Sequence, residues 1–275
     1  HMTAYENIAY GLKIRRLGDT EVHKEVTDIA KLLRISEILN KMPARMTQRE
    51  LQTVALARTL VTKPSILLLD EPLSNLDAAF RVKMRAELRT LQMKLEQTLI
   101  YVTHDQIEAM AMSDKVAVMN KGVLQQYGTP DEIYRRPQNK FVAGFIGMPP
   151  MNFIECSFVQ EGDKAYLDQG SFRVDITHLG SIIEEGRTGP EMILAIRPED
   201  ATIHERPPTK DAIEVSVESY DPMGSESIVY AKLGNHLIRL LTSGTFAGQP
   251  SDKRYIVLNV GAIHVIDKKT DKCIV

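Results

Sequence analysis

The sequence predicts an α/β domain followed by an all-β domain, and three observations favour this architecture. Residues 66–69 form a continuous apolar run that ends in the carboxylates Asp70 and Glu71, as expected of a strand buried on both faces of a parallel sheet. Apolar residues at helical spacing precede and follow that run. Beyond residue 152, short alternating segments recur between Gly, Pro and Asp turns, which is the pattern of a small antiparallel barrel.

Composition narrows the class of protein. The 275 residues are enough for two domains, and the apolar fraction of 43% is enough for two hydrophobic cores. A net charge of −2 gives no electrostatic sign of a nucleic-acid partner. Two cysteines, Cys156 and Cys273, argue against a disulfide framework and fit a reducing cytoplasm. No run of 18 apolar residues and no signal-peptide pattern occur, so we expect that the chain does not span a membrane.

The N-terminal part of the chain carries helix patterns. An apolar stripe at i, i+4, i+7 and i+11 predicts an amphipathic helix that starts near the capping residues Asp19 and Thr20. Its members are Val22, Val26, Ile29 and Leu33. A second, short helix is predicted over residues 36–41, ending before Pro43.

The two carboxylates after the apolar run are the first candidate site. Ligands of open α/β proteins bind at the carboxyl edge of the sheet, and adjacent side chains on an extended segment point to opposite faces. One of Asp70 and Glu71 can therefore hold a hydrated Mg²⁺ while the other polarises an attacking water. The alternative is a buried strand followed by an acidic helix cap.

A long helix and a second strand are expected next. Asp77 can cap the helix, whose other face carries alternating charges that we interpret as a solvated surface. The apolar stripe of this helix consists of Met84, Leu88, Leu91 and Leu95. Residues 98–103 are a short β-rich run that ends at His104. By itself, a histidine after a strand is most simply a loop residue.

Turn and cap residues organise the remainder of the chain. Lys121-Gly122 fits a hairpin turn between strands at 115–119 and 123–126. Thr129 caps a helix that has Pro130 at its first position. Residues 148–152, Met-Pro-Pro-Met-Asn, are predicted to be a stiff linker. The strands expected beyond it are 165–167, 172–176, 192–196, 213–217, 227–233, 236–241, 254–259 and 262–267.

Four segments resemble the ATPases of ATP-binding-cassette (ABC) importers. Residues 64–77, Pro-Ser-Ile-Leu-Leu-Leu-Asp-Glu-Pro-Leu-Ser-Asn-Leu-Asp, resemble the Walker B motif and D-loop. His104-Asp105, followed by Gln-Ile-Glu-Ala-Met, resembles the H-loop. Residues 125–147 resemble the end of the ATPase domain in sugar importers of the maltose type. Ile-Arg-Pro-Glu-Asp at 196–200 and the final strands resemble their OB-like regulatory (TOBE-type) domain.

The resemblance implies a fold and its boundaries. We expect an α/β partial P-loop NTPase core with a helical subdomain, followed by an all-β OB-like barrel. Residues 1–147 would be the C-terminal portion of the ATPase domain, with the helical subdomain at about 1–62 and the Walker B and H-loop core at about 63–147. Residues 148–152 would be the linker and 153–275 the regulatory domain. His1-Met2 either continues this resemblance or is a cloning remnant.

The resemblance also implies site roles. Asp70 matches the residue that holds Mg²⁺ through water, Glu71 the catalytic base and His104 the γ-phosphate contact. Ser74 and Asp77 belong to the D-loop, which crosses to a second subunit. Residues 54–60, Val-Ala-Leu-Ala-Arg-Thr-Leu, resemble the helix after the signature loop.

The signature loop itself is altered. Aligned without a gap, the family sequence LSGGQ falls on residues 46–50, where only the hydroxyl of Thr47 is retained among the nucleotide-binding positions. The family's two glycines let backbone N–H groups approach a phosphate closely. Here Gln48 and Arg49 place side chains in that space.

Two functional hypotheses follow. No Gly-Lys dipeptide occurs in the 275 residues, so we expect the N-terminal phosphate-loop part to be lacking and ATPase activity of this chain alone to be absent. The first hypothesis is the ATP-binding subunit of an importer of sugar or a related solute, with Mg²⁺ and ATP as cofactors. Its partners would be a second ATPase subunit in a homodimer and transmembrane permease subunits, without nucleic acid. It would be cytoplasmic and peripheral on the inner face of the cell membrane. The alternative is a non-catalytic remnant or a regulatory or dimerisation subunit.

Overall fold

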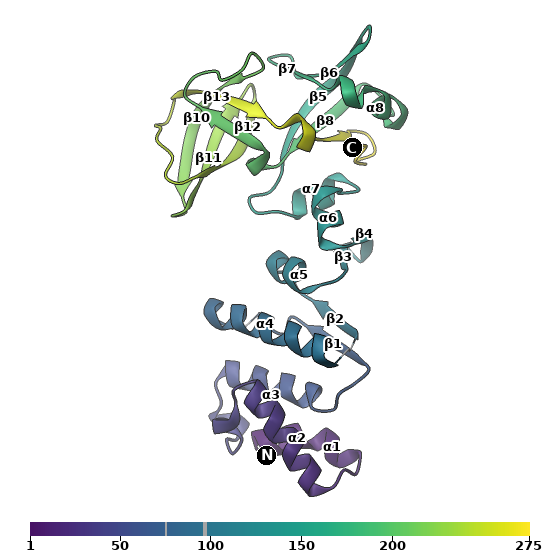
Figure 1. Cartoon of the computed structure of the whole chain (residues 1–275), viewed down its shortest axis with the longest axis vertical. Coiled ribbons are helices and arrows are strands. Elements are labelled where there is room, and N and C mark those ends of the chain that lie inside the picture. The colour runs from purple at the N-terminus through teal and green to yellow at the C-terminus, as the bar shows by residue number, and fades with distance from the viewer. Residues whose placement is uncertain (75, 96–97) are drawn as a thin grey trace. The chain divides into compact units, whose positions relative to one another are not determined.

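The structure, a computed structural model, describes residues 1–74, 76–95 and 98–275 (Figure 1). It divides into two compact units, His1–Ser113 and Asp114–Val275. The predicted linker at 148–152 lies inside the second unit, and its residue Asn152 is the first residue of a strand. The domain boundary at 148–152 therefore differs from this division and is kept as a proposal.

The first unit begins with a helical layer. Its elements are α1 (Ala4–Ile14), α2 (Asp19–Leu32), the 3₁₀ turns η1 (Ser36–Ile38) and η2 (Pro43–Arg45), and α3 (Gln48–Leu60). The predicted stripe on α2 is confirmed, because Val22, Val26, Ile29 and Leu33 are all buried in one core with α1 and α3. The helix expected over 36–41 is only the η1 turn. Met42 precedes Pro43 and is extended, since a residue before proline is disfavoured in a helix.

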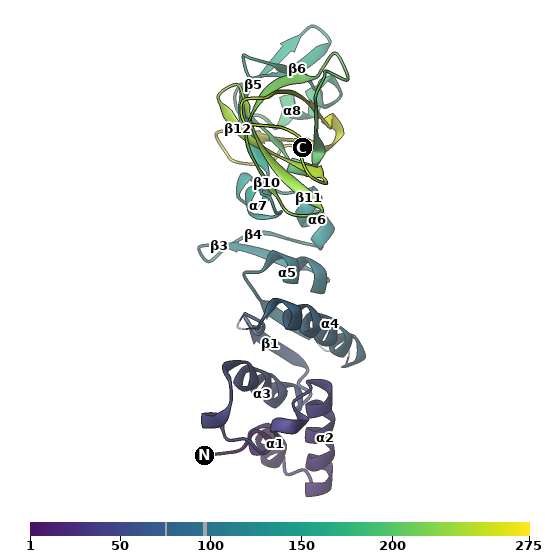
Figure 2. The ribbon, with the colours of Figure 1, turned by 90° about the vertical axis from the view of Figure 1, so that its left-hand side faces the viewer.

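A two-stranded parallel sheet lies next to the long helix α4 (Ala78–Leu95) of the same unit (Figure 2). Strand β1 (Ile66–Asp70) pairs with β2 (Thr98–Val102), and α5 (Gln106–Met112) follows β2. Leu67 and Leu69 enter the same hydrophobic core as Met84 and Leu88 of α4, which confirms these two stripe residues. The other two predicted stripe positions, 91 and 95, have side chains outside what the structure describes.

The prediction that β1 is buried on both faces is wrong. Ile66 and Leu68 are 56% and 67% exposed, and Ile100 and Val102 on β2 are each 53% exposed. Successive side chains of a strand point to opposite faces. The face with Leu67 and Leu69 packs on the helices, whereas no element among the described residues of the first unit covers the other face.

The second unit opens with a β-hairpin and two short helices. Strands β3 (Val116–Asn120) and β4 (Val123–Gly128) pair antiparallel, which confirms the hairpin. Lys121 and Gly122 both have positive φ, as a type I′ turn requires. The cap of α6 (Pro130–Arg135) is also confirmed, because the Thr129 side chain accepts a hydrogen bond from the Glu132 amide. Helix α7 (Lys140–Phe145) follows.

Two five-stranded sheets complete the second unit. One has the strand order β14-β8-β5-β6-β7 and the other β12-β11-β10-β13-β9, and their inward residues share one core. All eight predicted segments are strands, while β5 and β9 were not predicted. The strands are β5 (Asn152–Glu161), β6 (Lys164–Asp168), β7 (Arg173–Asp175), β8 (Glu191–Ile196), β9 (Ala201–His204), β10 (Ile213–Pro222), β11 (Glu226–Leu233), β12 (His236–Ser243), β13 (Lys253–Leu258) and β14 (His264–Asp267). The remaining helical pieces are η3 (Thr177–Leu179), α8 (Gly180–Gly186), η4 (Pro198–Asp200) and η5 (Val260–Ala262).

Arg197 joins the short helices to the sheets. Its side chain is buried, and the guanidinium donates to the Ile146 carbonyl at 2.8 Å and to the Tyr134 carbonyl at 2.5 Å. It also stacks on the Tyr134 ring at 3.6 Å. These contacts attach α6 and α7 to the β-rich part and explain why both belong to one compact unit.

Among the residues that the structure describes, no helix is long and apolar enough to cross a membrane.

Candidate functional site

The C-terminal ends of β1 and β2 bring the predicted catalytic side chains together. The strands are parallel and paired in register up to Asp70 and Val102, so both chains leave the sheet at the same edge. The amide of Glu71 donates to the Val102 carbonyl at 2.9 Å, which extends this pairing by one residue. Asp70 is exposed at the end of β1.

Glu71 and His104 contact each other at this edge. Nδ1 of His104 lies 3.1 Å from Oε1 of Glu71, and the two side chains are 71% and 48% exposed. A carboxylate beside an imidazole can orient the ring and attract its proton. Solvent also reaches both groups. The pair can therefore act on a water or an oxyanion presented from outside.

The backbone of Glu71 is held in a tight turn. Its φ is +44°, a region that a non-glycine residue adopts only when its surroundings enforce it. The Ser74 hydroxyl donates to the Glu71 carbonyl at 2.9 Å, and Nε2 of Gln52 donates to the Pro72 carbonyl at 2.6 Å. Ser74 and Gln52 thus fix the direction in which Glu71 projects. A nucleotide contact for Ser74 stays a prediction.

Asp77 contacts residues in the first turns of two helices, α4 and α3. Its Oδ1 accepts from the Phe80 amide at 2.9 Å, which confirms the predicted cap of α4. Its Oδ2 lies 3.6 Å from a guanidinium nitrogen of Arg49, and that guanidinium stacks 3.5 Å above the Phe80 ring. Arg49, which the ungapped alignment predicts at a signature glycine position, is therefore engaged by Asp77 and Phe80 of its own chain.

Thr47 lies at the N-terminus of α3 as part of a capping box. Its hydroxyl accepts from the Glu50 amide at 3.3 Å, and the Glu50 carboxylate accepts from the Thr47 amide at 2.8 Å. Lys41 donates to the same carboxylate at 2.7 Å, and the hydrogen bonds from Lys41 and Thr47 lower the pKa of Glu50. A negative carboxylate occupies this first turn, where a phosphate would otherwise be attracted. The predicted nucleotide contact of Thr47 is left as a prediction.

Sequence reasoning missed a charged network next to His104. Arg81, on the helix face assigned to solvent, contacts Asp105 at 3.6 Å and approaches Glu108 to 4.0 Å. Glu108 is 3% exposed. The segment after His104 that resembles the H-loop contains both Asp105 and Glu108. However, nothing in the spacing of Arg81 indicated that it reaches them.

The site residues fit part of a Mg²⁺–ATP site. Among the described residues, no group of three or more His, Cys, Asp or Glu side chains could hold a metal ion. Mg²⁺ in phosphate sites needs only one or two carboxylates besides waters and phosphates, and the exposed Asp70 meets that need. A loop that cradles the phosphates is not among the motifs of the sequence.

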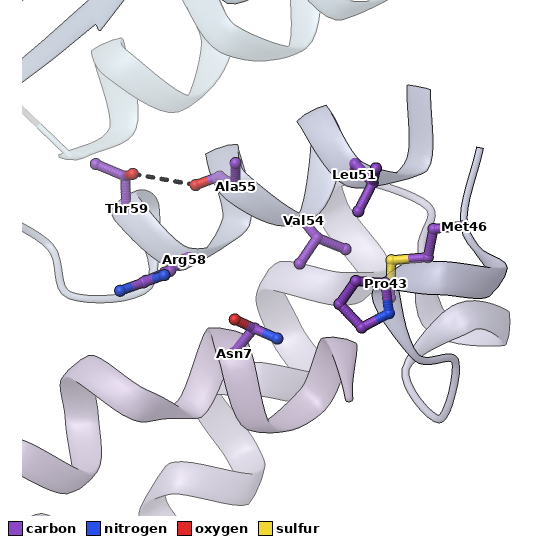
Figure 3. A pocket seen from close by; sticks show the side chains of 8 residues that line it. All are labelled: Asn7, Pro43, Met46, Leu51, Val54, Ala55, Arg58 and Thr59. Carbon is purple, nitrogen blue, oxygen red and sulfur yellow. Dashed lines mark hydrogen bonds between the residues drawn. The ribbon is translucent and has the colours of Figure 1, made fainter. Parts of the chain in front are cut away.

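A separate hollow lies between α1 and α3 (Figure 3). Its volume is about 360 Å³. The lining residues are Asn7, Pro43, Met46, Leu51, Val54, Ala55, Arg58 and Thr59. Thr59 bonds its own helix at the Ala55 carbonyl, and the lining contains no acid–base pair. The hollow therefore gives no indication of catalysis.

Comparisons with known proteins match both parts of the chain. The family described as ABC transporter matches residues 1–74, and the MalK OB fold domain matches residues 147–201. The trehalose/maltose import ATP-binding protein MalK of Thermococcus litoralis is 43% identical over all of this chain and 74% of its own length.

Two proteins of Bacillus subtilis are also similar. The uncharacterized ABC transporter ATP-binding protein YurJ is 38% identical over all of this chain and 76% of its own length. The oligosaccharides import ATP-binding protein MsmX is 37% identical over 98% of this chain and 74% of its own length.

Proposed function

Because this chain belongs to the family of ATP-binding subunits of ABC importers, we propose that it couples ATP hydrolysis to the uptake of a sugar or a related solute. The observation that supports this most directly is the contact between Glu71 and His104 at the carboxyl edge of β1 and β2. In this contact a carboxylate lies beside an imidazole, and Asp70 ends the same strand edge.

Each site residue then has a role. Glu71 accepts a proton from the attacking water, and His104 donates to an oxygen of the transferring phosphoryl group. Asp70 holds a water of Mg²⁺, which neutralises charge on the phosphates when bound. Ser74 and Gln52 keep Glu71 in its turn. Thr47, Ser74 and Asp77 face the nucleotide bound by a second subunit.

The proposed partners follow from the relatives that are named as import proteins. A second copy of the subunit would complete the nucleotide site, and transmembrane permease subunits would receive the conformational change. The chain would act in the cytoplasm, at the inner face of the cell membrane. Nucleic acid has no place in this proposal, since the net charge is −2.

A second candidate function is that of a non-catalytic subunit, which would regulate an ATPase partner or form a dimer with it without hydrolysing ATP. It is favoured by Gln48 and Arg49, which the ungapped alignment sets at the positions of the two signature glycines. The match to the ABC transporter family starts at residue 1 and does not confirm that a phosphate-loop part is lacking.

One experiment separates the two candidates. Mg-ATP binding is measured by calorimetry for this chain and for a fusion that adds the phosphate-loop segment of a full-length relative. We expect weak binding by the chain alone, and binding with hydrolysis by the fusion. Hydrolysis that Glu71→Gln abolishes supports the importer ATPase. A fusion that binds ATP without hydrolysing it supports the non-catalytic subunit.

A further inference from the structure

Arg81 touches the segment that follows Glu71. One terminal nitrogen of its guanidinium donates to the Leu76 carbonyl at 3.0 Å and to the Ser74 carbonyl at 3.4 Å. Ser74 in turn donates to the Glu71 carbonyl. The position of the Glu71 turn is therefore tied to the Arg81 side chain through a single intervening residue.

The same guanidinium faces the segment around His104. Its other terminal nitrogen lies 3.6 Å from Oδ2 of Asp105, and Nε lies 4.0 Å from Oε1 of Glu108. The Thr103 hydroxyl accepts from the Asp105 amide at 3.0 Å and donates to Glu108 at 2.8 Å. Both neighbours of His104 in the chain thus belong to the network that Arg81 joins.

Burial makes Glu108 depend on these partners. The Glu108 side chain is 4% exposed and also accepts from the Tyr101 hydroxyl at 2.9 Å. A buried carboxylate is costly unless hydrogen bonds and a cation compensate it. The planar guanidinium offers donors along several edges in a fixed geometry, which a lysine ammonium cannot reproduce.

We propose that Arg81 is a positioning residue that sets the contact between His104 and Glu71. It does so by holding the backbone at Ser74 and Leu76 through hydrogen bonds to their carbonyls, and the segment after His104 through its ion pairs with Asp105 and Glu108. The functional meaning of this placement rests on the proposed ATPase function. The placement of His104 and Glu71 by Arg81 does not require bound nucleotide.

The test measures the His104 ring without nucleotide. The chain is labelled with ¹⁵N-histidine, and His104→Gln identifies the His104 signals by their loss. The coupling is the change in the His104 nitrogen shifts caused by Glu71→Gln. We expect Arg81→Met to reduce this change at least twofold and Arg81→Lys to restore only part of it.

A matched control is available in the same unit. Arg34 forms an ion pair with Glu87 at 3.5 Å, so Arg34→Met removes an arginine from an ion pair elsewhere. It should leave the coupling unchanged. If Arg81→Met does not fold, Asp105→Asn decides the question. Asparagine still caps α5 toward Ile107 and Glu108, yet it loses the charge that faces Arg81, and the coupling should again fall.

The results of this test can be told apart from a failure of the proposed ATPase function. A full response of His104 to Glu71→Gln in the folded Arg81→Met or Asp105→Asn background overturns the positioning role. An inactive fusion protein with intact coupling would refute the ATPase function and leave the positioning role standing.

Discussion

Nδ1 of His104 lies 3.1 Å from Oε1 of Glu71, across the shared edge of two parallel strands. If Glu71 activates water, replacing its carboxylate should lower the rate of hydrolysis strongly. In the ATP-binding fusion described above, we expect Glu71→Gln to lower turnover by about a hundredfold or more. Nucleotide affinity should change little, because Glu71 does not hold the phosphates. Steady-state hydrolysis and calorimetry measure the two quantities, and an unchanged turnover would refute the role of Glu71 as base.

The altered signature segment gives a second prediction. Arg49 is engaged by Asp77 and Phe80, and no glycine amide is free to approach a phosphate there. Replacing Gln48 and Arg49 by glycine and Glu50 by glutamine should raise turnover of the fusion at least about tenfold, since one well-placed donor contributes about a hundredfold. Adding Glu71→Gln should abolish the gain. A fusion that is fully active with Gln48 and Arg49 in place would show that the ungapped alignment is wrong.

The exposed apolar face of β1 and β2 predicts self-association. Leu68 and Ile100 are 67% and 53% exposed side by side on paired strands, and such faces associate in water. We expect Leu68→Lys with Ile100→Lys to shift light scattering at tens of micromolar toward the monomer. Leu67→Lys is the matched control on the buried face and should unfold the unit instead. Monomeric parent protein at that concentration would contradict the prediction.

The buried carboxylate of Asp267 should make the stability of the second unit sensitive to acid. Burial by itself would raise its pKa, but hydrogen bonds from the amides and hydroxyls of Thr188 and Thr270 outweigh this and hold the pKa well below 3.8. A carboxyl whose pKa is depressed by folding stabilises the protein above its unfolded pKa and loses that contribution as pH falls. The second unit should therefore lose stability as the pH falls below about 4.

The Asp267→Asn variant isolates that contribution. We expect it to lower the free energy of unfolding by about 2 kcal/mol at pH 7, the usual scale for hydrogen bonds to a buried charged group. The part of the acid dependence below about pH 4 that comes from Asp267 should vanish with it. Chemical denaturation monitored at several pH values tests this, with Asp221→Asn as a control at an exposed carboxylate. Equal acid dependence in the Asp267→Asn variant and the parent would rule out this origin.

Much of the architecture could be predicted because it depends on neighbours in the sequence. Caps such as Thr129 and Asp77 act on amides three residues away. Most strand segments of the second unit alternate between apolar and polar residues, as half-buried strands do, whereas β8 is buried at five successive positions. The four segments that resemble ABC importer ATPases also predicted the family that the similar proteins show.

Other features were decided only by packing between distant parts of the chain. The open face of β1 depends on which elements cover it, and an apolar run of four residues does not specify this. Arg81 looks like a surface residue in the charge pattern of α4, yet it reaches Asp105 and Glu108 because α5 lies beside it. The sequence determined which chemical groups are present and the local elements that carry them. The tertiary structure decided which groups meet, because contacts such as that between Glu71 and His104 depend on strand pairing across a long stretch of chain.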